Sequence, residues 1–91
     1  MAGYSVVLKP SAAKNIDEID HRADRDRISR RLQSLADNPR PFGSEKLEGF
    51  EATYRVRQGD YRIVYDIDDA NRTVFVLKIR HRKDVYRRGH A

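Results

Sequence analysis

Cationic side chains recur at alternate positions along three segments in the C-terminal part of the sequence. They are Arg55, Arg57, Arg62, Lys78 and Arg80. In an extended strand, alternate side chains point to the same face, so these cations would gather on one face of a sheet. A guanidinium stays charged and can grip two phosphate oxygens at once. The spacing therefore predicts a surface that binds a polyanion, and nucleic acid is the first candidate.

A cation-rich tail follows the last of these segments and adds groups that can transfer protons. It carries His81 and Tyr86 among the cations Arg82, Lys83 and Arg87. Histidine exchanges protons near neutral pH, and nearby positive charge lowers the pKa of a tyrosine. Tyrosine can also stack on an unpaired base. The alternative interpretation is that Tyr86 is an apolar plug at the sheet edge and that His81 is an ordinary surface residue.

The net charge of +5 lies entirely in the C-terminal part of the sequence. Up to Tyr54, 9 Lys and Arg balance 9 Asp and Glu, whereas from Arg55 onward 10 Lys and Arg stand against 5 Asp and Glu. Such segregation indicates a surface for a polyanion or an acidic protein. On the predicted strands only Asp66 and Asp68 offset the cations. The alternative is a solvated sheet face, whose cations discourage edge-to-edge aggregation.

The N-terminal half of the sequence predicts one strand and two helices that help to position this face. Residues 4–9 largely alternate between apolar and polar side chains, which is typical of a strand. Ser11 can cap a helix that begins at Ala12. A second helix is expected after a break at residues 21–24, and it should end near Ala36, before two prolines that disfavour helix.

The C-terminal half predicts three consecutive antiparallel strands. A loop at residues 42–52 comes first. Alternating runs at residues 54–58 and 61–66 then flank a two-residue connection suited to a tight hairpin turn. A third run covers residues 73–80. The predicted fold class is α+β: an N-terminal strand, a helical hairpin and a three-stranded antiparallel meander, with the helices packed on one face of one sheet.

The two-residue turn at Gly59 and Asp60 fixes the register of the predicted hairpin. Arg57 then lies opposite Arg62, although like charges across a strand pair are destabilising. An arrangement that costs stability favours a functional role for the cationic face. The other face should pack against the helices, and its predicted members are Tyr54, Val56, Ile63, Tyr65, Phe75, Leu77 and Ile79.

Composition narrows the classes of protein. With 91 residues and 38% hydrophobic side chains, the sequence suits a single domain with a small core. There is no cysteine for a disulfide or a thiolate zinc site, and His21, His81 and His90 are too scattered to suggest a metal. No cofactor is expected. No apolar run approaches the ~20 residues of a membrane-spanning helix, and no signal segment is recognised, so a cytoplasmic protein without membrane contact is expected.

Three pieces of the sequence resemble the RelE/ParE superfamily of type II toxins. They are Lys46–Gly49, Tyr54–Tyr65 and His81–Arg87. The order of strands and helices is also similar, so we treat residues 1–91 as a single RelE-like toxin domain with residues 81–91 as a functional tail. The tail resembles the RelE branch, whose members cleave mRNA in the ribosomal decoding site and thereby inhibit translation.

The resemblance implies a metal-independent endoribonuclease, an mRNA interferase, in which the ribose 2′-hydroxyl attacks the adjacent phosphate. Arg57, Arg62 and Arg80 would stabilise the charge on that phosphate, and Tyr86 and His81 would transfer protons. The best-studied members carry lysines at the positions that correspond to Arg55 and Arg57, so this sequence departs from the pattern there. The difference matters because arginine is a poor general base. The cations expected to bind flanking RNA are Arg55, Lys78, Arg82, Lys83 and Arg87.

The resemblance also implies a cognate RelB-like antitoxin, and mRNA on the ribosome as the substrate. The antitoxin would block the basic face or displace the tail from Arg82 onward. Two alternatives remain open. One is a ParE-like toxin that inhibits DNA gyrase, and the other is a catalytically inactive homologue that binds only its antitoxin or nucleic acid. A position of Tyr86 beside Arg57 and Arg62 would favour the nuclease.

Overall fold

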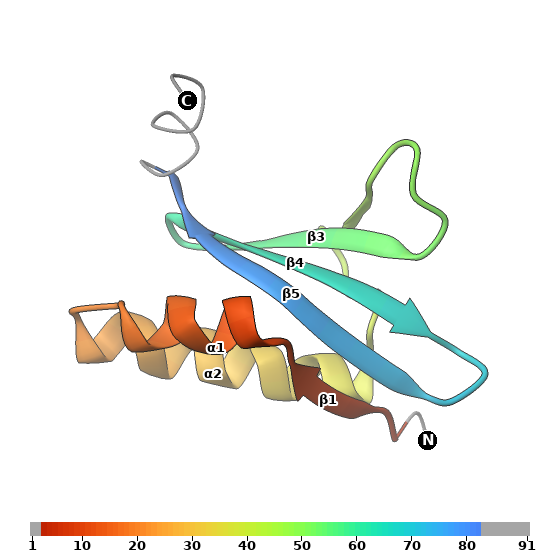
Figure 1. The fold of residues 1–91 in the computed structure, drawn as a ribbon, viewed down its shortest axis with the longest axis horizontal. Coiled ribbons are helices and arrows are strands. Elements are labelled where there is room, and N and C mark those ends of the chain that lie inside the picture. The colour runs from red at the N-terminus through yellow and green to blue at the C-terminus, as the bar shows by residue number, and fades with distance from the viewer. Residues whose placement is uncertain (1–2, 83–91) are drawn as a thin grey trace.

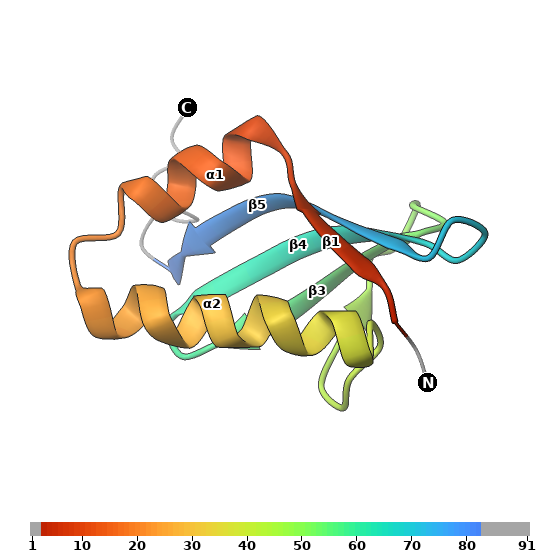
Figure 2. The ribbon, with the colours of Figure 1, turned by 90° about the horizontal axis from the view of Figure 1, so that it is seen from below.

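The computed structural model describes residues 3–82, which form a five-stranded sheet covered on one face by two helices (Figures 1 and 2). The elements are β1 (Ser5–Leu8), α1 (Pro10–Asp17), α2 (Arg22–Asp37), β2 (Glu45–Lys46), β3 (Thr53–Gln58), β4 (Tyr61–Asp68) and β5 (Thr73–His81). The strand order across the sheet is β1-β5-β4-β3-β2. β1 is parallel to β5, and the other pairs are antiparallel. The predicted α+β class is confirmed.

Two local predictions in the N-terminal half and the following loop need correction. α1 begins at Pro10, after Lys9, and not at Ala12 behind a Ser11 cap. Proline suits the first turn because it lacks an N–H that would be unpaired there. The predicted loop at residues 42–52 contains β2, whose Glu45 pairs with Arg55 of β3. Two residues are too few to produce an alternating pattern.

The central hairpin has the predicted register. Val56 lies opposite Ile63, and Arg57 lies opposite Arg62. The turn depends on Gly59, whose φ of +61° is strained for any residue with a side chain. A positive φ at the first turn position is what a two-residue hairpin of this kind requires.

A bulge between β4 and β5 decides which side chains of β5 face the helices. The pairing skips one residue of β5, Leu77. Before the bulge, Val74 and Val76 are fully buried against the helices, and after it Ile79 is buried as predicted. The prediction that Phe75 and Leu77 also face the helices is wrong, because both are half-exposed on the other side. All four residues from 74 to 77 are apolar, so alternation could not reveal the phase.

The core lies between the two helices and the sheet. Tyr65 is fully buried and donates its hydroxyl to the carbonyl of Pro39 at 2.8 Å. Asn15 of α1 accepts a hydrogen bond from the backbone N–H of Ile79 at 3.0 Å, which fixes α1 against the end of β5. No charged side chain among residues 3–82 is buried. The core side chains are Ala12, Ile19, Ile28, Leu32, Leu35, Val56, Ile63, Tyr65, Ile67, Val74, Val76 and Ile79.

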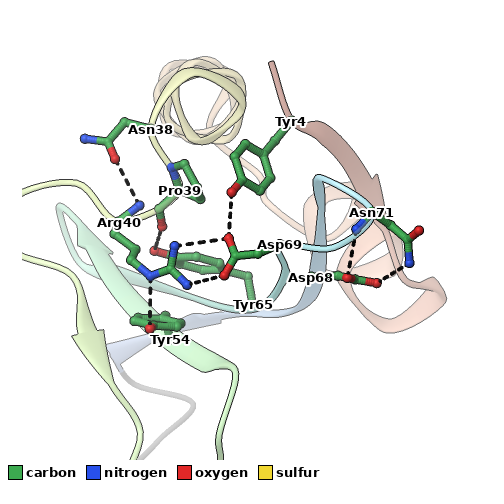
Figure 3. A network of polar contacts seen from close by, with 9 residues as sticks. All are labelled: Tyr4, Asn38, Pro39, Arg40, Tyr54, Tyr65, Asp68, Asp69 and Asn71. Carbon is green, nitrogen blue, oxygen red and sulfur yellow. Dashed lines mark hydrogen bonds and ion pairs between the residues drawn. The ribbon is translucent and has the colours of Figure 1, made fainter. Parts of the chain in front are cut away.

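A polar network, here called the Arg40 clasp, joins four segments at the end of the sheet that carries the β4–β5 turn (Figure 3). The Arg40 guanidinium donates two hydrogen bonds to Asp69, at 3.2 and 2.8 Å, and a third to the Tyr54 hydroxyl at 3.1 Å. Tyr4 of the N-terminal segment donates its hydroxyl to the same carboxylate at 2.6 Å. The bonds from Arg40 and Tyr4 lower the pKa of Asp69 to about 2. The clasp therefore ties the segment before β1, the strand β3 and the loop after α2 to the β4–β5 turn.

Candidate functional site

The face of the sheet that points away from the helices, here called the open face, gathers the predicted cations. Arg57 of β3 pairs with Arg62 of β4, and Arg62 pairs with Arg80 of β5. Because the buried neighbours Val56, Ile63 and Ile79 point to the helices, alternation turns the three arginines to the open face. We call these three residues the arginine row. Neighbouring strands are about 4.8 Å apart, so their stems begin side by side.

A second row lies next to the arginine row, one pleat further along the strands. It runs from Glu45 of β2 through Arg55 of β3 and Val64 of β4 to Lys78 of β5. Arg55 donates to the Glu45 carboxylate at 3.0 Å. A hollow between the two rows is lined by Gly43, Glu45, Arg55, Arg57 and Arg62. The sequence-predicted phosphate ligands Arg55, Arg57 and Arg62 thus share one hollow.

The arginine row keeps its positive charge without a partner carboxylate in the described part of the chain. Within residues 3–82, the only ion pair on the open face is the one that Arg55 makes with Glu45. Like charges directly opposite each other on paired strands are destabilising, and the row contains two such pairs. An unneutralised cluster of this kind is preorganised for an anion that supplies the missing charge.

His81 does not join the arginine row, although it directly follows Arg80. It pairs with Tyr61 across β4 and β5, one residue beyond the row, so its side chain is turned to the helix side. Its ring meets the Tyr61 ring edge-on, with centroids 4.9 Å apart and an interplanar angle of 81°. Tyr61 in turn packs against the core. The ring of His81 therefore lies on the opposite side of the sheet from the three guanidinium groups.

The tail leaves the sheet beside the arginine row. The backbone N–H of Arg82 donates to the carbonyl of Asp60 at 2.8 Å, which ties the start of the tail to the β3–β4 turn. The Arg82 side chain is exposed. Lys83, Tyr86 and Arg87 lie outside the described residues.

A second hollow on the open face, here called the apolar hollow, adjoins the first. Lys78 and Arg80 stand on its rim. Its position follows from the bulge in β5, which places the adjacent residues Leu77 and Lys78 on the same side of the sheet. The other residues that line it are Leu47, Phe50, Thr53, Val64, Asp66 and Leu77.

Sequence reasoning missed two features of the open face. It did not find Glu45, which forms an ion pair with Arg55, because β2 is too short to show alternation. It also placed Leu77 in the core, and thus did not expect the apolar hollow. Asp66 and Asp68, the two acidic residues expected on the predicted strands, lie near the end of β4 away from the β3–β4 turn. Asp66 accepts a hydrogen bond from Thr53 at 2.5 Å, and Asp68 accepts two from Asn71.

Between residues 3 and 82, no three His, Asp or Glu side chains are grouped as a metal ion would need. Neither α1 nor α2 is long and apolar enough to cross a membrane.

A family model described as the ParE toxin of the parDE type II toxin–antitoxin system matches residues 6–86. The chain belongs to this toxin family. The match covers both helices and every strand except the first residue of β1, so it includes the whole arginine row. The assignment to the RelE/ParE superfamily, made from three sequence pieces, is confirmed.

Relatives with RelE-type names show the same likeness. Toxin RelG of Mycobacterium tuberculosis is 29% identical over 85 residues, which cover 93% of this chain and 98% of the relative. The RelE–RelB complex of Pyrococcus horikoshii OT3 has a TM-score of 0.78 at 28% identity, with 88% of this toxin and 96% of that chain covered. The RelBE2 complex of M. tuberculosis has a TM-score of 0.75 at 25% identity, with 87% and 98% covered. The toxin is thus RelE-like over most of its length.

Proposed function

We propose that this toxin is a ribosome-dependent mRNA endoribonuclease that cleaves in the decoding site and so inhibits translation. The arginine row is the observation that carries the proposal. Three guanidinium groups stand side by side on the sheet face opposite the helices, with no carboxylate of the described residues to neutralise them. A phosphate group undergoing attack gains negative charge, and fixed cations stabilise that charge without having to reorganise.

The proposed reaction is attack of a ribose 2′-hydroxyl on the adjacent phosphate, followed by departure of the 5′-oxygen. Arg57, Arg62 and Arg80 stabilise the five-coordinate phosphate. Arg55 holds a neighbouring phosphate, which requires it to exchange its contact with Glu45 for one with RNA. The remaining proposed contacts to flanking RNA are Lys78, Arg82, Lys83 and Arg87.

The proton transfers need groups other than arginine, since a guanidinium is not deprotonated in proteins. Glu45 lines the same hollow as Arg55, Arg57 and Arg62, and its carboxylate is a proton acceptor for the 2′-hydroxyl. Tyr86 in the tail is our proposed donor to the leaving oxygen. A direct role for His81 would require its ring to leave Tyr61, so we propose that His81 supports the end of β5 from which the tail departs.

A cognate RelB-like antitoxin is the proposed partner. The related toxins of P. horikoshii and M. tuberculosis were solved as complexes with their antitoxins. An acidic segment would neutralise the arginine row and so prevent RNA from binding, or it would displace the tail from Arg82 onward.

The test is cleavage of a defined mRNA on programmed ribosomes. We expect the native toxin to cut within the decoding site, and we expect Arg62→Ala to lower the rate roughly 100- to 1000-fold, the usual effect of losing one charge-stabilising donor. Tyr86→Phe should also lose most activity. Arg30→Ala, which removes an exposed arginine from α2, is the matched control and should cut normally. Intact mRNA after incubation with the folded native toxin would refute the proposal.

Gyrase inhibition is the second candidate, because the family model that matches the chain is described as a ParE toxin. A supercoiling assay with purified DNA gyrase separates the two. Inhibition of gyrase by a toxin that leaves ribosome-bound mRNA intact would replace the nuclease assignment.

A further inference from the structure

The apolar hollow beside the arginine row has no role in the reaction described above. We propose that it binds one nucleobase of a single-stranded RNA whose phosphate is held by the arginines. This inference rests on the proposed function, since it names the part of the RNA that the open face recognises.

The walls of the hollow suit a flat, apolar group. Leu47 and Phe50 come from the loop between β2 and β3, which rises on the side of the sheet away from the helices (Figure 1). Val64 and the bulged Leu77 form the floor. The side chain of Phe50 is 61% exposed, an unusual position for a large apolar ring. An exposed ring above an aliphatic floor can stack on a base of any sequence.

The hollow lies at the distance from the arginine row that a nucleotide requires. Val64 follows Arg62 by two residues on the same face of β4, a step of about 6.6–6.8 Å along a strand. Arg80 belongs to the row and also stands on the rim of the hollow. A phosphate at the row would therefore leave its ribose near Arg80 and Lys78, with the base above Val64 and Leu77.

The far end of the hollow offers an acceptor for the edge of a base. Asp66 lies there, held by its hydrogen bond from Thr53 at 2.5 Å. A carboxylate accepts hydrogen bonds from the exocyclic amino groups of bases, which uracil lacks. The order of cation, apolar floor and acceptor thus matches the order of phosphate, base face and base edge. An apolar side chain from a protein partner would use the floor but would add no hydrogen bond to the one that Asp66 accepts from Thr53.

The test is equilibrium binding of the full chain to a short, fluorescein-labelled, single-stranded oligonucleotide with 2′-fluoro sugars, which cannot be cleaved by 2′-hydroxyl attack. In a matched series of the same oligonucleotide, each member lacks the base at one position and keeps its sugar and phosphate. We expect Phe50→Ala to weaken binding about 10-fold, within the range found for one stacked base. Phe50→Tyr should retain affinity, whereas Phe50→Leu should not. Phe42→Ala is the control, because Phe42 is fully exposed and does not line the hollow.

The base-deleted series locates the contact. One deletion should weaken binding to the native toxin as much as Phe50→Ala does, and the two changes together should cost no more than either alone. At that position cytosine should bind more tightly than uracil. Equal affinity of native toxin and Phe50→Ala would overturn the inference, and so would no binding at all. Native affinity of Phe50→Leu for the oligonucleotide would show that no base stacks on the Phe50 ring, and it would also overturn the inference. Cleavage on ribosomes tests the proposed function separately, since the nuclease can act without a base site.

Discussion

Replacing Arg62 by glutamine is expected to make the toxin more stable while removing most of its activity. Arg62 on β4 is the middle member of the arginine row. It has a like charge on each side, Arg57 on β3 and Arg80 on β5. Glutamine keeps much of the side-chain length and removes the charge. The substitution therefore relieves two repulsive pairs at once.

The size of the effect follows from the sheet geometry. Directly opposed charges on paired strands change stability by roughly 0.2–1 kcal/mol per pair, so two pairs give a gain of about 1 kcal/mol. For a domain of this size, 1 kcal/mol raises the melting temperature by about 4–8 °C. At 1 M salt, where the Debye length is about 3 Å, exposed charges hardly interact. The gain should then nearly vanish.

The assay is thermal unfolding of native toxin and Arg62→Gln at low salt and at 1 M salt, followed by circular dichroism. Arg30→Gln is the control, because Arg30 is exposed on α2 and Asp26 precedes it by one helical turn. That variant should show no gain. A lower melting temperature for Arg62→Gln, or a gain that high salt does not reduce, would refute the idea that the row is held together against its own repulsion.

Three further substitutions test the site and the scaffold. Glu45→Gln should slow cleavage roughly 100- to 10,000-fold and remove the acid limb of the pH–rate profile, if Glu45 accepts the 2′-hydroxyl proton; an unchanged profile would assign that step elsewhere. Asp69→Asn should lower the melting temperature at neutral pH without affecting cleavage, because the Arg40 clasp lies far from the arginine row. The pKa of Asp69 is lowered from 3.8 to about 2 on folding. Its contribution to stability is therefore present above pH 4 and is lost as the pH falls through 2, so the two melting curves should coincide only below pH 2. Tyr65→Phe should cost about 1–2 kcal/mol in urea unfolding, because it leaves the Pro39 carbonyl without its donor; an unchanged midpoint would mean that another group satisfies that carbonyl.

The parts of the fold that sequence could predict are those with strong local rules. The turn at Gly59 allows one register only, so the pairing of Arg57 with Arg62 was correct from the sequence alone. The open-face position of Lys78 and Arg80 was also correct. The prediction of that position rested on simple alternation from residue 73, whereas in the structure a bulge turns Lys78 and Arg80 to the open face.

The parts that sequence could not predict depend on contacts between distant segments. The bulge at Leu77 falls in an apolar run whose two faces look alike, and only burial of Val74 and Val76 against the helices selects the phase. β2 exists because Glu45 and Lys46 pair with β3, not because of any pattern of their own. β5 continues one residue beyond its predicted end, and this extra pairing turns His81 toward Tyr61.

The bulge also determines how the strand β5 can change in length. β5 buries Val74 and Val76 near its start and Ile79 near its end. Because three positions separate Val76 from Ile79, the strand can bury both only by leaving one residue unpaired in a bulge. Deletion of Leu77 alone would leave Val76 and Lys78 as consecutive residues opposite Tyr65 and Val64, so regular alternation would still bury Ile79 and keep Arg80 on the open face. The change would remove the side chain that Leu77 adds to the apolar hollow. A toxin without this residue should therefore keep its fold and its arginine row, so β5 can differ in length by one residue at the bulge.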